Sequence, residues 1–131
     1  MKINKLLLVG LGLFLVSALL AACGSNQETN FPTGKFKKVG APNHGLIFNK
    51  DGTFSVFEGD ITLVRGTYSV DGDAYTEESN DAGCTDVPRS FKYTFDGTNL
   101  TFSYVGNPAE DTCGGGGRRA DFDNVTYTLS E

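Results

Sequence analysis

The amino-acid sequence predicts an all-β domain, a small antiparallel barrel of about eight strands in up-and-down order. After Pro32, apolar and polar residues alternate with a period of two, and turn residues interrupt the alternation about every 8 to 14 positions. No segment shows an apolar stripe at helical spacing. Most connections are short enough for hairpins, so successive strands can pair and the sheet can close without a bare edge. A two-sheet sandwich remains the alternative arrangement.

The first five strands are expected near residues 33–39, 44–49, 53–58, 61–70 and 73–79. Leu46 and Phe48 lead through the turn residues 49–52 to Phe54, which predicts a hairpin between the second and third strands. The Asp-Gly turn at 71–73 separates the fourth strand from the fifth. Both turns contain carboxylates that could attract calcium, but neither has the remaining ligands of a calcium loop, so we interpret them as hairpin turns.

The fourth strand changes phase along its length. Ile61 and Leu63 occupy odd positions, whereas Tyr68 and Val70 occupy even ones. A β-bulge or kink near residues 65–66 would place both pairs on one face of the sheet.

The last three strands are expected near residues 89–96, 99–105 and 121–129. Aromatic and polar residues alternate over 91–95 and again over 100–104, and the turn 96–99 joins the two runs into a hairpin. Apolar residues at every second position from 125 to 129 predict the closing strand.

These alternations place a set of apolar and aromatic side chains inside the barrel: Phe36, Leu46, Phe48, Phe54, Val56, Tyr68, Val70, Tyr75, Phe91, Tyr93, Phe95, Leu100, Phe102, Tyr104, Val125, Tyr127 and Leu129. An eight-stranded barrel is just wide enough to be filled by its own side chains or to hold one small ligand. Aromatic bulk favours a filled core, whereas the tyrosine hydroxyls need partners that a ligand or a water could supply. Both alternatives stay open.

The amino terminus has the pattern of a secretory signal peptide. Lysines and the apolar run 6–20 are followed by two alanines and Cys23. The stretch Leu-Ala-Ala-Cys at 20–23 resembles the lipobox of bacterial lipoproteins. This resemblance implies cleavage before Cys23, which would then carry a lipid anchor of two or three acyl chains. An ordinary signal peptide is the alternative, and the run is too short for a comfortable transmembrane span.

Three regions follow from this interpretation: a lipoprotein signal peptide at 1–22, the lipidated cysteine and a polar tether at 23–32, and one barrel domain at 33–131. The expected location is extracytoplasmic, with Cys23 anchored in the bacterial cell membrane. Cleavage leaves 9 basic against 16 acidic side chains. Because nucleic-acid binding needs a basic face, we expect no nucleic-acid partner.

Two cysteines remain once Cys23 is assigned to lipid. Outside the cytoplasm, Cys84 and Cys113 are expected to form one disulfide, worth about 3 to 4 kcal/mol on the chain-entropy model. A metal site is the competing interpretation, but neither cysteine has a CxxC or histidine partner nearby. We therefore expect no metal and no cofactor.

The chain also resembles a family. Gly34-Lys35-Phe36 is similar to the glycine-x-aromatic start of lipocalins, and the segments 48–54, 66–70 and 100–102 resemble the small lipocalin-like (calycin-type) domains of secreted bacterial proteins. A cysteine before the aromatic hairpin and an Asp-x-Cys followed by arginine after it match the same order. The resemblance spans roughly 33–129. It departs from larger lipocalins at Phe36, where they have tryptophan, and in the long gap before the arginines.

The four glycines after Cys113 occupy that gap. A phosphate-binding loop would need a Lys-Ser/Thr pair and a following helix, and neither is present, so we interpret the glycines as slack chain. The lipocalin resemblance implies that Arg118 or Arg119 lies across Phe36 and caps one end of the barrel, a cation–π contact of about 1 kcal/mol. Which arginine would do so stays open, and both could instead be solvent-facing charges.

The sequence predicts no enzyme. His44 has no partner within its motif, no GxSxG elbow is present and no reduced cysteine is left as a nucleophile. The first functional hypothesis is a lipid-anchored, lipocalin-like binder of a small apolar or amphipathic ligand, with the binding residues Tyr68, Tyr93, Phe102 and Tyr104. The alternative is an envelope module with a filled core that binds a protein through the loops 80–90 and 106–120.

Overall fold

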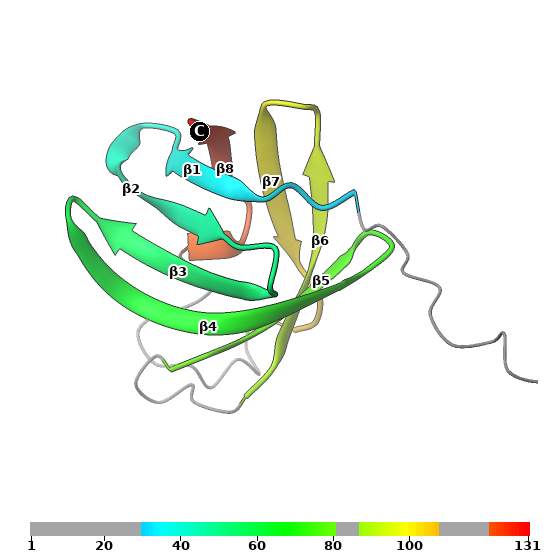
Figure 1. Cartoon of the computed structure of the whole chain (residues 1–131). Helices are drawn as coiled ribbons and strands as arrows, with labels where there is room; N and C mark the ends of the chain where they lie inside the picture. The colour runs from blue at the N-terminus through cyan, green and yellow to red at the C-terminus, as the bar shows by residue number, and fades with distance from the viewer. Residues whose placement is uncertain (1–29, 81–86, 108–120) are drawn as a thin grey trace, which may run out of the picture.

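The protein folds into a closed antiparallel barrel whose strands follow one another around the ring in chain order (Figure 1). The computed structural model describes residues 30–80, 87–107 and 121–131. The strands are β1 (Gly34–Lys38), β2 (Ala41–Phe48), β3 (Thr53–Glu58), β4 (Ile61–Asp71), β5 (Ala74–Ser79), β6 (Arg89–Phe95), β7 (Asn99–Tyr104) and β8 (Thr126–Leu129). The predicted all-β up-and-down barrel is confirmed, and the sandwich alternative is wrong. The lipocalin resemblance itself stays a prediction.

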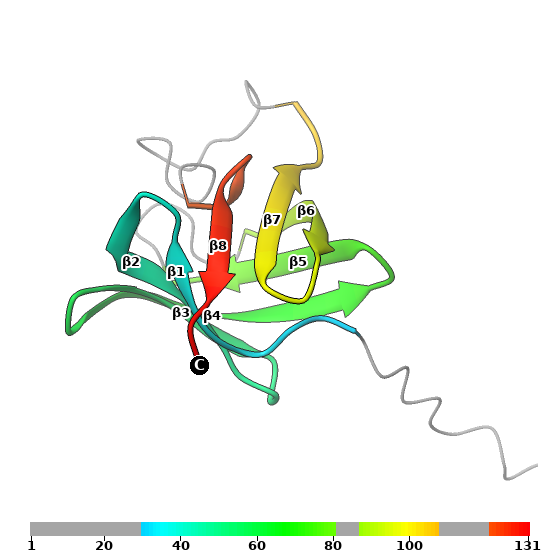
Figure 2. The same ribbon diagram turned by 90° about the horizontal axis from the view of Figure 1, so that it is seen from above.

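The barrel closes where β8 lies between β7 and β1 (Figure 2). Phe36 pairs with Leu129 across this seam. Beyond the paired strands, the Lys35 amide donates to the Glu131 carbonyl at 2.9 Å and the Ser130 amide donates to the Lys35 carbonyl at 2.8 Å. Every described strand therefore has a neighbour on both sides, and no strand edge is left bare.

The closing strand is shorter than expected, because it begins at Thr126 and not at 121. Asn124 adopts a positive φ of 56°, a conformation in which asparagine is enriched. Its amide donates to the Phe102 carbonyl at 2.9 Å. The chain turns here before it enters β8, and this turn brings the Phe122 side chain into the core with 1% exposure.

The expected irregularity in β4 is present, but it lies earlier in the strand. Val56 faces Val64 while Phe57 faces Thr62, so Leu63 is the extra residue on β4. From Val64 onward, even-numbered residues point inward, which explains the change of phase in the sequence.

The two ends of the barrel differ in what they carry. At the first, here named the tether end, lie residues 30–33, which lead into β1, and the turns 49–52, 71–73 and 96–98. Figures 1 and 2 both show the blue start of the described chain beside the β4–β5 turn. At the second, named the loop end, lie the turns β1–β2 and β3–β4, the last residues of β5 and β7, and the first residues of β6 and β8.

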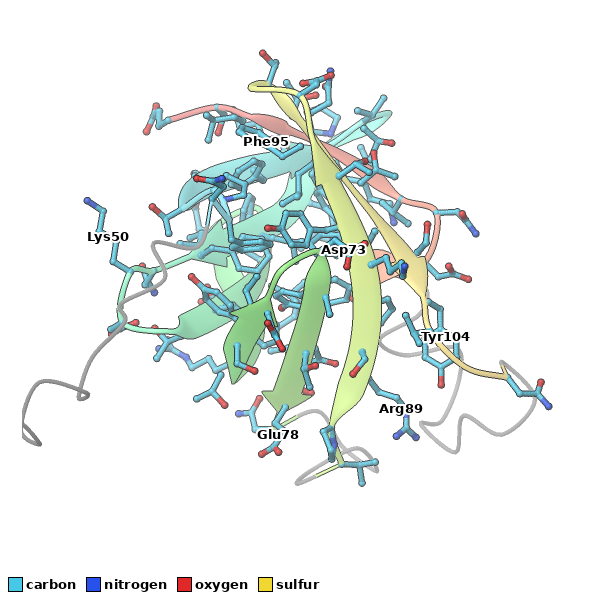
Figure 3. All side chains as sticks on the ribbon, turned by 90° about the vertical axis from the view of Figure 1, so that its right-hand side faces the viewer. Lys50, Asp73, Glu78, Arg89, Phe95 and Tyr104 are labelled. Atoms are coloured by element: carbon cyan, nitrogen blue, oxygen red, sulfur yellow. The ribbon has the colours of Figure 1, made fainter. Side chains whose placement is uncertain are left out.

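Side chains fill the described interior of the barrel (Figure 3). All of the side chains predicted to point inward belong to one core cluster, either buried or packed against the buried members. Three further residues join that cluster: Phe31, Val64 and Phe122. Tyr75 and Phe102 are among its fully buried members and lie with their ring centroids 5.0 Å apart.

Candidate functional site

Three of the four predicted ligand-binding residues converge at the tether end. Tyr68, Tyr93 and Phe102 surround a single point, which the ring of Phe31 occupies. Tyr104 does not join them, because it packs against Phe91 at a centroid distance of 5.5 Å. Figure 3 shows Tyr104 toward the opposite end of the β6–β7 hairpin from Phe95. The predicted set is therefore divided between two levels of the barrel.

Phe31 closes the tether end from outside the sheet. It precedes β1, yet only 7% of it is exposed. Its ring stacks on Tyr75 at 5.4 Å and meets Phe48 and Tyr93 edge to face at 5.0 and 4.9 Å. Phe31 lies in the segment predicted as the polar tether, and its place in the core was not predicted. The available signal was a lone aromatic residue at the end of a polar segment, directly before Pro32.

The tyrosine hydroxyls at this end already have partners within the protein. Tyr68 donates to the carbonyl of Asn49 at 2.7 Å, and Tyr93 donates to the carbonyl of Gly72 at 3.2 Å. Burial raises the pKa of both phenols, and the carboxylates of Asp51 and Asp73, respectively, raise it further. Both side chains are thus neutral donors that tie the rings to the adjacent turns, and neither hydroxyl needs a ligand.

The aspartate side chains in the acidic turns accept hydrogen bonds from backbone amides close by in the sequence. Asp51 Oδ1 accepts from the Thr53 amide at 2.9 Å, and Asp96 Oδ1 accepts from the Asn99 amide at 2.7 Å. The Thr53 hydroxyl, which donates to Asp51 Oδ1 at 2.6 Å, is the main reason that the pKa of Asp51 lies below the usual value, and the Asn99 amide is the main reason for Asp96. The interpretation of 49–52 as a hairpin turn is confirmed. In the described part of the chain, no group of three or more His, Cys, Asp or Glu side chains could hold a metal ion.

Polar side chains enter the core toward the loop end. Glu77 is fully buried and Ser79 is 5% exposed. With Asp121 and apolar neighbours they line a cavity of about 10 Å³. A space of that size is about what one water molecule needs. Among the described residues, the Ser79 hydroxyl has no hydrogen-bond partner. The cavity is therefore suited to a single water, which Ser79 would bind, and not to an organic ligand.

His44 takes part in a long-range pair beside this cavity. Its Nε2 lies 2.8 Å from Asp121 Oδ1, and its Nδ1 lies 3.8 Å from Glu58 Oε2. Only 16% of the His44 side chain is exposed. Because both ring nitrogens face carboxylates, the pair has the geometry of a structural link between β2 and the segment before β8. The sequence could not show it, because the partners are 77 positions apart.

Other predicted site residues lie outside the described part of the chain: Cys23, Cys84, Cys113, Arg118 and Arg119. Their lipid, disulfide and capping roles stay predictions. Phe36, the expected partner of the arginines, is fully buried, and its ring contacts Phe48 and Phe95 at 6.0 and 6.3 Å.

Comparison with protein-family models, with curated proteins and with solved structures finds no match for this chain. Within the residues that the structure describes, no helix has the length and apolar character needed to cross a bilayer.

Proposed function

We propose that this protein is a non-catalytic, lipid-anchored module of the bacterial cell envelope, whose filled barrel presents its loop end to a protein partner. The observation that carries the proposal is the packed interior. Phe31 occupies the space among Tyr68, Tyr93 and Phe102 where a ligand was expected. With that space filled, the surface of the barrel is the part left for recognition.

The tether gives the barrel an orientation. Phe31 is eight positions after Cys23, and a chain of that length spans at most about 28 Å when fully extended. A lipid on Cys23 would therefore keep the tether end close to the membrane. The loop end would point away from the bilayer, toward other envelope components.

The loop end carries the large apolar side chains that the described surface exposes most. Ile61 and Leu63, at the start of β4, are 67% and 52% exposed, Val39 in the β1–β2 turn is 61% exposed, and Val105 after β7 is 49% exposed. Single exposed apolar residues are ordinary. Their presence at one end of a barrel with a filled core supports a contact surface for a protein with an apolar patch.

The test is site-specific photocrosslinking in intact cells. A photoreactive side chain at Leu63 is compared with one at Ser69, which is also exposed on β4 but lies near the tether end. We expect one discrete protein adduct from position 63 and none from position 69, and substitution of Ile61 by glutamate should abolish the adduct. Equal labelling at both positions, or none at either, would count against the proposal.

A second candidate function is the lipocalin-like binding of a small apolar or amphipathic ligand. This candidate is favoured because Phe31, whose ring fills the site, belongs to no strand and is therefore not part of the barrel wall. Native mass spectrometry of the lipoprotein extracted gently from its membranes tests this candidate. A stoichiometric adduct that is lost on denaturation would support the binder, whereas lipidated protein alone would support the module.

A further inference from the structure

The contacts that hold Phe31 in place are contacts between rings. Among the described residues, no hydrogen bond involves Phe31 or Pro32, and the backbone first joins the sheet at β1. The other aromatic residues at this end belong to strands with neighbours on both sides. Phe31 is therefore the one member of the aromatic group at the tether end that can leave without breaking a described backbone hydrogen bond.

The rings around Phe31 form an aromatic cage, which consists of Phe48, Tyr68, Tyr75, Tyr93 and Phe102. Tyr75 lies nearly parallel to the Phe31 ring, with an interplanar angle of 22°. Phe48 and Tyr93 stand at 87° and 85° to it. Stacked and edge-to-face contacts are the two arrangements that aromatic pairs prefer. The cage thus matches one six-membered ring in both arrangements.

The cage is held together without help from Phe31. Its members come from five different strands, β2, β4, β5, β6 and β7. The hydroxyls of Tyr68 and Tyr93 are bound to turn carbonyls, which restrains these two rings at the rim. Phe48 and Tyr68 also contact each other directly at 5.3 Å. A site whose walls are restrained in this way loses little conformational freedom when a ligand enters.

We propose that the aromatic cage is a binding site for one uncharged phenyl or phenol group, and that Phe31 is its resident occupant. An incoming aromatic ligand takes the place of Phe31, and the tether is then released from the barrel. This site goes beyond the proposed function, which assigns recognition to the loop end. The ligand class follows from the cage, because it is lined by ring faces and edges and its two rim hydroxyls are already committed to turn carbonyls.

Ligand binding and tether release are linked in this arrangement. The ligand binds only the fraction of molecules in which Phe31 is out, so the apparent affinity of the wild-type protein is reduced by that fraction. Reciprocally, a bound ligand favours the released tether. Occupancy of the barrel would thereby change how freely it moves on its lipid anchor.

The first experiment measures the binding of toluene and phenol to the full-length mature protein in detergent, by heteronuclear NMR titration. The Phe31→Ala variant is expected to bind at least tenfold more tightly than the wild type, with shift changes at Tyr68 and Tyr93. Phe31→Leu refills the cage with an aliphatic side chain and is the matched control, expected to resemble the wild type. A folded Phe31→Ala variant with no gain in affinity would overturn the proposal.

A peptide with the sequence of residues 26–33 provides an independent readout. We expect it to bind Phe31→Ala in trans and to compete with toluene, whereas the same peptide with alanine in place of phenylalanine should not bind. Failure of the phenylalanine peptide to compete would show that the cage does not select this ring.

If the Phe31→Ala variant does not fold, the wild-type protein still provides a test. In the presence of saturating toluene, the amide shifts of Asn30, Phe31 and Thr33 should move toward free-chain values. Unchanged shifts in that segment, with toluene in excess, would overturn the proposal.

Discussion

Phe54 on β3 stands directly opposite Gly66 on β4, and its ring occupies the space that a side chain at Gly66 would need. A Cβ atom placed on Gly66 would lie 2.5 Å from the Phe54 ring and 2.1 Å from the carbonyl oxygen of Glu78. The glycine is therefore required by the close approach of its neighbours, with no need for an unusual backbone conformation.

Gly66→Ala should destabilise the barrel, because both the ring and the β5 backbone would have to shift. Overpacking of this kind costs about 1 to 3 kcal/mol or more. Urea denaturation measures the loss. Ser69→Ala, at an exposed position on the same strand, is the control and should stay within about 0.5 kcal/mol of the wild type. Equal stability of the two variants would mean that Phe54 repacks freely.

Tyr127→Phe should change stability in a pH-dependent way. The Tyr127 hydroxyl donates to the carbonyl of Asp121, and its loss should cost about 1 kcal/mol at neutral pH. Burial and, to a lesser extent, the Asp121 carboxylate raise the pKa of this phenol above its ordinary value of 10.0. Above pH 10 the unfolded chain ionises while the folded one does not, so wild-type stability falls as pH rises. The variant should lose stability less steeply there, as measured by urea midpoints across alkaline pH.

Asp96→Ala should weaken the β6–β7 hairpin, because Asp96 accepts hydrogen bonds from the backbone amides of Thr98 and Asn99. The Asn99 amide, followed by the Asn99 side chain and the Thr98 amide, lowers the pKa of the carboxyl from its ordinary value of 3.8. Because the pKa of Asp96 is lower in the folded chain, the ionised carboxylate stabilises the fold at pH values above the pKa of the unfolded chain. This contribution is lost as the pH falls through the pKa of the folded chain. The stability difference between wild type and variant should therefore shrink in strong acid. Thermal unfolding of both proteins at neutral and acidic pH measures this difference. A stability difference that does not change with pH would exclude the ionised Asp96 carboxylate as its cause.

A double-mutant cycle should separate the two carboxylates that face His44. The part-buried contact with Asp121 at 2.8 Å should give a coupling free energy of about 1 kcal/mol. The contact with Glu58 is longer, at 3.8 Å, and that side chain is 65% exposed, so screening should leave no measurable coupling. Chemical denaturation of the single and double alanine variants gives both values. The reverse order would mean that the histidine side chain turns toward Glu58 in solution.

Period-two alternation was sufficient to find every strand, because a paired strand alternates its faces regardless of its partner. Among the inward positions on the strands it missed Val64 and the buried Glu77. It could not find Phe31 or Phe122, which reach the core from segments that are not strands. The error at Tyr104 has a different origin. Alternation gives the face of a residue, whereas depth in the barrel depends on register.

The β6–β7 turn shows how that depth follows from pairing. Phe95 pairs with Leu100, Tyr93 with Phe102, and Phe91 with Tyr104. Tyr104 therefore lies two residue pairs further from the turn than Phe102 and cannot reach Phe31. Counting outward from 96–99 would have separated it from Tyr93. The His44–Asp121 contact, in contrast, depends on closure of the whole barrel and has no local signal.

The seam between β1 and β8 also has a consequence for how the chain acquires its fold. Ser130 donates its hydroxyl to the Lys35 carbonyl across 95 positions of sequence. Contacts between residues so far apart make folding slow, since a long loop must close before the pairing is formed. A chain that leaves the cytoplasm from its amino terminus would therefore remain open until its final strand had emerged. In the export that the amino-terminal pattern predicts, late closure would leave the polypeptide open enough to be translocated, and the barrel would close only after translocation.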